Sequence, residues 1–325
     1  MRNSRFALSR VDGTPLFYEE AGTSRRERPD SCAQIGEGQQ ADPRPDVVLC
    51  DGVGCDGYVW KHLLADLTPR YRTIHPHYRG HGRSPKPERA EAVRIEDLAE
   101  DVLSVLDDAD SPSAVLMGHS MGVQVCLEVY RREPHRVAGL VLICGAPGHV
   151  LRSFRGNDAL EPMLPGLRKA VSRSPRLFNK LARTLIPTQL AYALAAAVEI
   201  DARVLQEPDF MPYLEGLARV DVDLFLAMVA SAAEHSAIDV LPTVRVPSLI
   251  VAGDRDGFTP CWRSREMLEN IPRAEAIWID GGSHTAPLEY PDVVGAGVLD
   301  FLQRRVAAAG PPAPRAEHPE HDDFD

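Results

Sequence analysis

The sequence has no long apolar run. Its most apolar segment, around Leu190 to Val198, is far shorter than the roughly 18 consecutive apolar residues that a membrane-spanning helix needs. The N-terminal residues 1–6 also lack the apolar stretch of a secretion signal. These absences predict a protein without a membrane span, and they favour the cytoplasm as its location.

Cysteine is sparse, and its spacing is uninformative. The six cysteines never occur as Cys-x-x-Cys, and three of them, Cys50, Cys126 and Cys144, lie in apolar segments. This pattern favours buried free thiols over disulfides or a zinc site. The sequence also shows no cluster of metal-ligating residues and no phosphate-binding glycine loop. We therefore expect neither a metal nor an organic cofactor.

Positive charge is in deficit. The chain has 36 lysines and arginines against 47 aspartates and glutamates, and the net charge of −11 argues against general nucleic-acid binding, which needs a basic face. The charge selects no other partner and indicates no oligomeric state. A hydrophobic content of 44% over 325 residues allows a sizeable buried core, in one large α/β domain or two small ones.

Alternating strand and helix patterns predict an α/β fold. A β-hairpin is expected over residues 5–20, around the Asp12-Gly13 turn. Strand then alternates with helix, which is typical of a mostly parallel, doubly wound sheet. The predicted strands are 47–50, 71–76, 114–117, 137–144, 247–252 and 274–279, and the predicted helices are 60–67, 95–106, 123–132, 261–271 and 293–306.

Three segments depart from this rhythm. Residues 22–46 are polar and have too little apolar surface to offset ordering, so we expect a flexible insertion. Residues 147–242 are almost entirely helical in pattern, with the best helices at 160–171, 178–185, 190–204 and 220–233. We expect them to form a helical cap inserted into a core made of 1–146 and 243–308. The tail, 309–325, is expected to be disordered.

The motif Gly118-His119-Ser120-Met121-Gly122 follows a predicted strand and precedes a predicted helix. This G-x-S-x-G pattern is typical of a nucleophile elbow, a turn so sharp that Cβ atoms on the two glycines would collide with neighbouring backbone. The turn exposes the serine hydroxyl beside the positive end of the following helix.

A serine hydroxyl needs a base at hydrogen-bond distance, and that base needs an orienting carboxylate. Two later strands are followed by loops that carry these groups. The loop after 247–252 contains Asp254 and Asp256, and the loop after 274–279 contains His284. The order Ser, acid, His is the order found with an elbow nucleophile.

These motifs resemble the α/β-hydrolase superfamily, in its cap-bearing branch, over nearly all of the chain outside the insertion and the tail. The resemblance implies that Ser120 is the nucleophile, His284 the general base and later acid, and Asp256 the orienting carboxylate, because the family's G-x-x-D pattern ends on it. Asp254 remains the alternative acid. His119 is expected to point away from the reacting atoms.

The resemblance also limits the chemistry. Haloalkane dehalogenases and epoxide hydrolases of the superfamily carry aspartate at the elbow, so Ser120 argues against both. The reactions that remain compatible with a serine nucleophile are cleavage of esters, thioesters, lactones, amides and C–C bonds beside a carbonyl, and perhydrolysis. We expect hydrolysis of an ester in a small, partly apolar acyl substrate. A non-catalytic ligand receptor on the same fold is the alternative from a different functional class.

Two backbone N–H groups, those of Val53 and Met121, are the expected oxyanion hole. Where relatives usually have His-Gly-x-x, this chain has Asp51-Gly52-Val53-Gly54, and His77 stands where the family's Arg-Gly-x-Gly-x-Ser loop is usually preceded by aspartate. One hypothesis is that Asp51 and His77 form a structural pair. The alternative is two unrelated substitutions.

Candidate substrate contacts lie around this loop and in the cap. Near the nucleophile they are Gly52, Gly54, Tyr58, Trp60 and His119, although Trp60 fits the core equally well. The apolar cap candidates are Met163, Leu164, Leu167, Phe178, Leu190, Tyr192, Phe210, Met211, Tyr213, Phe225 and Met228. The cap is locally basic, which indicates a solvated helix face or recognition of an anionic group, through Arg168, Lys169, Arg173, Arg176, Lys180 and Arg183.

Overall fold

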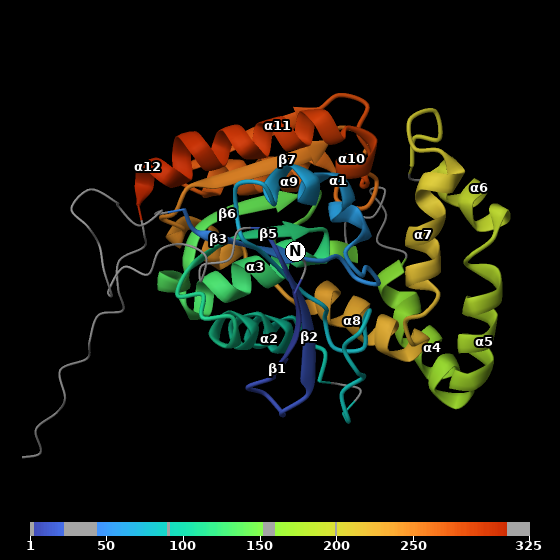
Figure 1. Cartoon of the computed structure of the whole chain (residues 1–325). Coiled ribbons are helices and arrows are strands. Elements are labelled where there is room, and N and C mark those ends of the chain that lie inside the picture. The colour runs from blue at the N-terminus through green and yellow to red at the C-terminus, as the bar shows by residue number, and fades with distance from the viewer. Residues whose placement is uncertain (1–2, 23–43, 90–91, 152–159, 199, 311–325) are drawn as a thin grey trace, which may run out of the picture.

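The structure, a computed structural model, describes residues 3–22, 44–89, 92–151, 160–198 and 200–310 (Figure 1). Most of the predicted insertion, 23–43, and the end of the predicted tail, 311–325, lie outside the described residues. In the part of the chain that is described, no helix has the length and apolar character to cross a membrane.

One eight-stranded sheet forms the centre of the molecule, in the order β1-β2-β4-β3-β5-β6-β7-β8. The pairs β1–β2 and β2–β4 are antiparallel, and all other neighbours are parallel. The predicted hairpin and mostly parallel sheet are thereby confirmed. The strands are β1 (Asn3–Leu8), β2 (Pro15–Ala21), β3 (Asp46–Cys50), β4 (Thr73–Pro76), β5 (Ala114–His119), β6 (Val137–Ile143), β7 (Ser248–Gly253) and β8 (Ala274–Ile279).

Helices cover both faces of this sheet, as Figure 1 shows. α2 and α3 pack together on one face, and α1 and α11 pack together on the other. The helices of the core are α1 (Lys61–Leu67), α2 (Ile95–Asp108), α3 (Met121–Arg132), α9 (Cys261–Asn270), α10 (Ala286–Glu289), α11 (Pro291–Phe301) and α12 (Ala307–Ala309).

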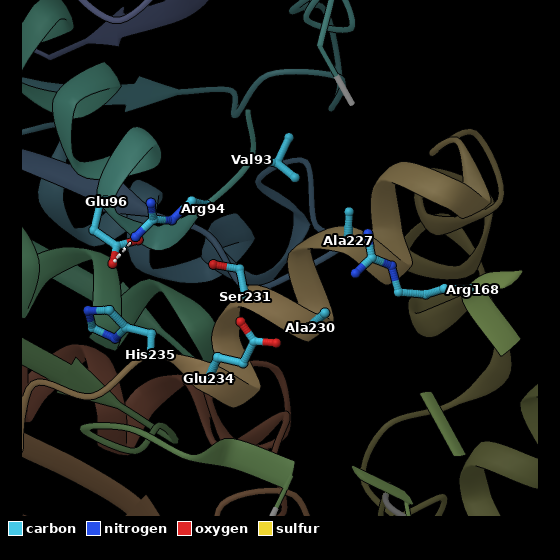
Figure 2. Close-up of a pocket in the computed structure, with 9 residues that line it drawn as sticks. All are labelled: Val93, Arg94, Glu96, Arg168, Ala227, Ala230, Ser231, Glu234 and His235. Carbon is cyan, nitrogen blue, oxygen red and sulfur yellow. Dashed lines mark hydrogen bonds and ion pairs between the residues drawn. The ribbon is translucent and has the colours of Figure 1, made fainter. Parts of the chain in front are cut away.

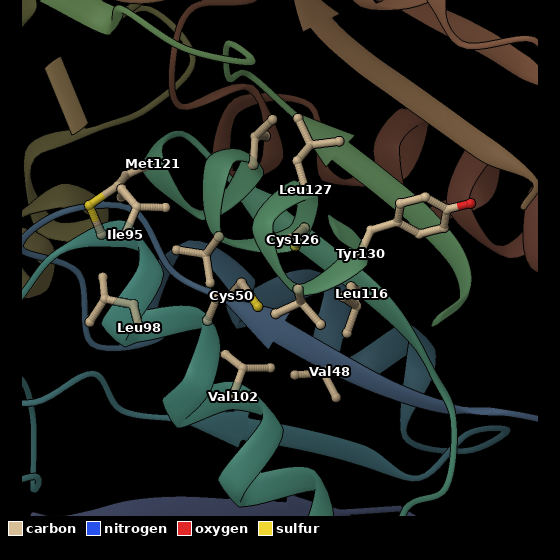
Figure 3. Close-up of a cluster of buried hydrophobic side chains, with 14 of the residues drawn as sticks. Val48, Cys50, Ile95, Leu98, Val102, Leu116, Met121, Cys126, Leu127 and Tyr130 are labelled. Carbon is tan, nitrogen blue, oxygen red and sulfur yellow. The ribbon is translucent and has the colours of Figure 1, made fainter. Parts of the chain in front are cut away.

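Successive side chains of the buried strands pack into two separate cores, one on each face of the sheet. In β3, Val48 and Cys50 belong to the core under α2 and α3, whereas Val47 and Leu49 belong to the core under α1 and α11. Because successive side chains of a strand point to opposite faces, a strand buried on both sides is apolar at every position. Figure 3 shows the first core, where Val102 of α2 lies close to Val48 and Cys50.

In the part of the chain that is described, five α-helices lie between β6 and β7. They are α4 (Leu160–Arg173), α5 (Pro175–Leu185), α6 (Gln189–Val198), α7 (Glu207–Leu217) and α8 (Val222–Glu234). The helix predicted over 190–204 is wrong at its end, because α6 stops at Val198. Sequence reasoning missed α7, whose prolines Pro208 and Pro212 resemble helix breakers.

α8 joins the inserted helices to the core. Its Leu224 and Met228 are fully buried and belong to the core formed with α2 and α3. A Cβ atom on Gly80 would lie 2.0 Å from Leu224 Cδ2, so α8 packs directly on the loop that follows β4. The inserted helices therefore sit beside the carboxyl ends of the parallel strands, where ligands bind in open α/β sheets.

Candidate active site

Ser120 stands on the sharp turn between β5 and α3. Its φ of 55° and ψ of −120° lie outside the helix and strand regions, which is the strained conformation of a nucleophile elbow. A Cβ atom on Gly118 would lie 2.4 Å from the Gly122 carbonyl oxygen, and one on Gly122 would lie 2.0 Å from the Cys50 carbonyl oxygen. Only glycine fits at either position.

His284 connects Ser120 to Asp256. Its Nε2 lies 2.9 Å from Ser120 Oγ, and its Nδ1 lies 3.1 and 3.0 Å from the two carboxylate oxygens of Asp256. The three side chains come from loops after β5, β7 and β8, which end at the same edge of the parallel sheet. In this arrangement Nδ1–H donates to the carboxylate, and Nε2 can accept the hydroxyl proton.

The two loop aspartates have different partners. Asp256 is buried, and its Oδ1 accepts hydrogen bonds from the backbone N–H groups of Phe258 and Thr259 at 2.9 and 2.7 Å. Its Oδ2 accepts the Thr259 hydroxyl at 2.7 Å. Asp254 is exposed and accepts the backbone N–H of Gly281 at 2.7 Å. Asp254 thus closes the turn between two loops, while Asp256 faces the imidazole.

The loop after β3 lies against the elbow. A Cβ atom on Gly52 would lie 3.1 Å from Ser120 Cβ, so this glycine lets the backbone approach the serine closely. Among the described residues no hydrogen bond engages the backbone N–H of Val53 or Met121. Both groups are therefore available to an oxyanion.

Sequence reasoning missed the residue that holds this loop, His81. Its Nδ1–H donates to the Arg79 carbonyl at 3.2 Å, and its Nε2 accepts the backbone N–H of Gly54 at 3.1 Å. Burial lowers the pKa of His81, which keeps the ring neutral and Nε2 an acceptor. The only signal in the sequence is its place as the first variable residue of Arg-Gly-x-Gly-x-Ser.

His119 lies behind His284. It is 3% exposed, and its Nε2–H donates to the backbone carbonyl of His284 at 2.9 Å. Burial, and then the neighbouring His284 ring, lower the pKa of His119 to about 4, so the imidazole is neutral. His119 therefore supports the loop of His284 from behind, which agrees with the expectation that it points away from the reacting atoms. It is too buried to serve as a substrate contact.

Asp51 pairs with His75, so the hypothesis of an Asp51–His77 pair is wrong. Asp51 Oδ2 lies 2.9 Å from His75 Nε2, whereas His77 Nε2 has no hydrogen-bond partner among the described residues. The β3 and β4 strands are neighbours, but their pairing ends at Val48 and Ile74. Beyond that point strand pairing no longer fixes the position of Asp51 relative to β4, and its side chain contacts His75 of β4.

An unpaired Asp51 carboxylate beside the loop that carries Val53 would repel the negative charge of an oxyanion, and the pairing with His75 offsets this repulsion. Burial acts to raise the pKa of Asp51, but His75 and the hydrogen bonds outweigh burial and hold the pKa below its usual value. The pKa of His75 is raised, because the attraction of Asp51 outweighs the effect of burial. The Asp51 carboxylate is therefore charged and is paired with His75.

Two predicted substrate contacts belong to other parts of the fold. Trp60 is fully buried, and its Nε1–H donates to Asp51 Oδ1 at 2.6 Å. It is a core residue, and its prediction as a substrate contact is wrong. The Tyr58 hydroxyl donates to the backbone carbonyl of Asp209 in α7, so Tyr58 ties the core to the inserted helices.

A family model for the alpha/beta hydrolase fold matches residues 45–291. The chain belongs to this family. A relative from Variovorax paradoxus (strain S110), named "Putative carbamate hydrolase RutD", is 29% identical over 272 residues, which cover 82% of this chain and 94% of that protein.

Solved structures of alpha/beta hydrolases resemble this one in fold. The enol-lactonase from Burkholderia xenovorans LB400 aligns with a TM-score of 0.70 and 22% identity over 92% of this chain and 100% of that one. A thermophilic esterase from Thermogutta terrifontis aligns with a TM-score of 0.68 and 20% identity over 93% and 98%. The predicted fold and family are confirmed.

This alpha/beta hydrolase has an apolar cavity of about 320 Å³ within the inserted helices. Two of its lining residues also lie against the loop after β3, since a Cβ atom on Gly54 would lie 2.4 Å from Leu217 Cδ1 and 3.0 Å from Phe225 Cε2. The cavity is lined by Leu167, Val171, Phe178, Leu181, Ala182, Leu185, Ile186, Leu217, Val220, Val222, Phe225 and Leu226.

The apolar cap residues that were predicted to contact substrate differ in their surroundings and in how exposed they are. Leu167, Phe178 and Phe225 line this cavity, whereas Phe210 and Met228 are buried in packed clusters. Met163 and Leu190 are exposed, as are most of the basic residues, namely Lys169, Arg173, Arg176, Lys180 and Arg183.

A second cavity, of about 350 Å³, lies between the start of α2 and α8 (Figure 2). Arg168 of α4 and Glu234 of α8 line it, together with an ion pair between Arg94 and Glu96 at 2.8 Å. Among the described residues, its lining is mixed in charge and includes none of the loops that carry Ser120, Asp256 and His284.

Proposed function

We propose that this chain is a serine hydrolase that cleaves an ester, or a related acyl bond, of a small and partly apolar substrate. The observation that carries the proposal is the continuous hydrogen-bonded path from Asp256 through His284 to Ser120, with contacts of 3.0 and 2.9 Å. A serine hydroxyl linked in this way to a neutral imidazole is an activated nucleophile.

The reaction follows from these contacts. Ser120 Oγ attacks the acyl carbonyl while His284 Nε2 takes the hydroxyl proton, and the backbone N–H groups of Val53 and Met121 stabilise the oxyanion. As the intermediate collapses, His284 gives its proton to the leaving alcohol and an acyl-enzyme remains. His284 then takes a proton from water, the hydroxide attacks the acyl carbon, and the proton returns to Ser120.

The inserted helices, 147–242, would act as a cap that supplies the acyl pocket. Support comes from the apolar cavity between α4, α5 and α8, and from the contact of its lining residues Leu217 and Phe225 with the oxyanion loop at Gly54. An apolar acyl chain entering this cavity would leave its carbonyl near Ser120. A small polar acyl group would gain nothing from it.

The test is covalent labelling by a fluorophosphonate, followed by turnover of p-nitrophenyl esters of increasing acyl length, a lactone and a carbamate. We expect labelling and turnover of the wild-type chain, and neither in Ser120→Ala. The variant should fold normally, because the hydroxyl is on a loop. Ser4→Ala, which removes an exposed serine of β1, controls for nonspecific labelling. Labelling without turnover of any substrate would favour the receptor alternative.

A further inference from the structure

Glu289 is a buried carboxylate beside the loop of His284. It is the last residue of α10, follows His284 closely in the chain and is only 4% exposed. Burial of a charged side chain is costly unless hydrogen bonds replace the water that it loses. Sequence reasoning gave Glu289 no role, and it is not part of the path from Asp256 through His284 to Ser120. The reason for its burial lies in its contacts.

The first set of contacts holds the two neighbours of His284. Glu289 Oε2 accepts the backbone N–H of Ser283 at 2.8 Å, and Oε1 accepts the Ser283 hydroxyl at 2.6 Å. The hydroxyl of Thr285 donates to Oε1 at 3.2 Å. One carboxylate thus holds the residues on both sides of the histidine, and it fixes the backbone from which the imidazole reaches Ser120.

The same carboxylate also contacts the inserted helices. Its Oε1 accepts the backbone N–H of Asp201, which lies between α6 and α7, at 2.9 Å. Leu288, the residue before Glu289, is buried in one apolar cluster with Ile200 and Leu205. A hydrogen bond to a carboxylate and an apolar contact therefore join this segment to α10.

The side chain of Asp201 extends the link to the loop of Asp256. Its Oδ2 lies 3.7 Å from Arg255 Nη1, and Arg255 directly precedes Asp256 in the chain. An ion pair with an exposed arginine adds little stability. It does show that the segment around Asp201 lies beside both loops, the one that carries Asp256 and the one that carries His284.

Only a carboxylate satisfies both backbone groups. The N–H of Ser283 points at Oε2 and the N–H of Asp201 points at Oε1, so both oxygens must accept. Glutamine has one acceptor oxygen, and in either orientation its NH₂ group faces one of these two N–H groups. Glu289→Gln keeps the size of the side chain and therefore breaks the contact either to the His284 loop or to the inserted segment.

We propose that Glu289 is a positioning residue that locks the loop of His284 and the segment 200–205 into one unit. It acts through Ser283 and touches no substrate. A misplacement of a catalytic group by about 1 Å can cost on the order of 100-fold in rate, so the carboxylate affects turnover through the alignment of His284 with Ser120. This catalytic consequence rests on the proposed hydrolysis, whereas the link between the two segments does not.

The link is tested without activity, by hydrogen exchange of the full chain resolved to the amides of Asp201 and Ser283. Both amides should be protected in the wild type, and Glu289→Gln should speed the exchange of at least one of them by about tenfold. Glu269→Gln, at an exposed carboxylate of α9, should change neither. An unprotected amide in the wild type, or unchanged exchange in Glu289→Gln, would overturn the proposal. The wild-type measurement holds even if the variant does not fold.

The values of kcat and KM for a p-nitrophenyl ester separate positioning from a purely structural role. Glu289→Gln should lower kcat by about 10- to 100-fold and keep KM within about threefold, because a misaligned imidazole impairs proton transfer and not binding. A lower thermal midpoint with unchanged kcat would make the role of Glu289 only structural and would overturn the proposal. A wild type without turnover would instead refute the proposed hydrolysis, and the exchange data would still decide whether the link exists.

Discussion

Asp256→Asn should nearly abolish turnover while leaving the fold intact. In the wild type, Oδ1 accepts two backbone N–H groups and Oδ2 accepts the Thr259 hydroxyl, with His284 Nδ1 lying 3.1 and 3.0 Å from the two oxygens. Asparagine has one acceptor oxygen, and the two backbone N–H groups at Oδ1 require it. The amide NH₂ then replaces Oδ2 and faces His284 Nδ1.

The consequence is a change of tautomer. An NH₂ group that faces His284 Nδ1 makes this nitrogen an acceptor, and the ring proton moves to Nε2. That nitrogen lies 2.9 Å from Ser120 Oγ and can then no longer accept the hydroxyl proton. In serine hydrolases of another fold the same substitution lowers kcat by about 10⁴, which corresponds to roughly 5 kcal/mol of transition-state stabilisation.

The matched control is Asp254→Asn, two residues away in the same loop. It should lose part of one exposed hydrogen bond to Gly281 and keep turnover within about threefold of wild type, since exposed contacts are worth little. The assay is kcat for a p-nitrophenyl ester, with the free energy of unfolding from urea titration as the check on folding. Greater damage from Asp254→Asn, or a loss below tenfold in Asp256→Asn, would refute the reasoning.

Three further outcomes are expected. Ala182→Phe should fill part of the apolar cavity and lower kcat/KM for long-chain esters relative to acetate, by roughly fourfold for each methylene excluded, at ~0.8 kcal/mol per methylene. His119 has a folded-state pKa of about 4, below the unfolded value of about 6.5, so stability should fall as pH drops through this interval. By pH 5 the loss should be on the order of 2 kcal/mol, and His119→Gln should lack it; an equal loss in the variant would contradict the assignment. A double-mutant cycle on unfolding should give a coupling of about 0.5–3 kcal/mol between Asp51 and His75, and a larger coupling between Asp51 and His77 would contradict the observed pairing.

Much of the fold could be predicted because its signals are local. Buried strands are apolar at every position, the elbow needs glycines on both sides of Ser120, and the order of the acid and histidine loops follows the order of the strands. Each of these signals involves residues that are close together in the chain, so a single sequence is enough to detect it. The prediction missed α7, because Pro212 inside this helix resembles a helix breaker. It also extended the preceding helix too far, because the helical spacing of apolar residues continues beyond Val198, where α6 ends.

The chain alone thus predicted the sheet and the three loops at one edge of it that carry Ser120, Asp256 and His284. Only the tertiary structure decided which side chains meet across strands. Asp51 reached His75 because the pairing of β3 with β4 ends before Asp51. Contacts between residues remote in sequence depend on register and on loop paths, and no local pattern carries that information.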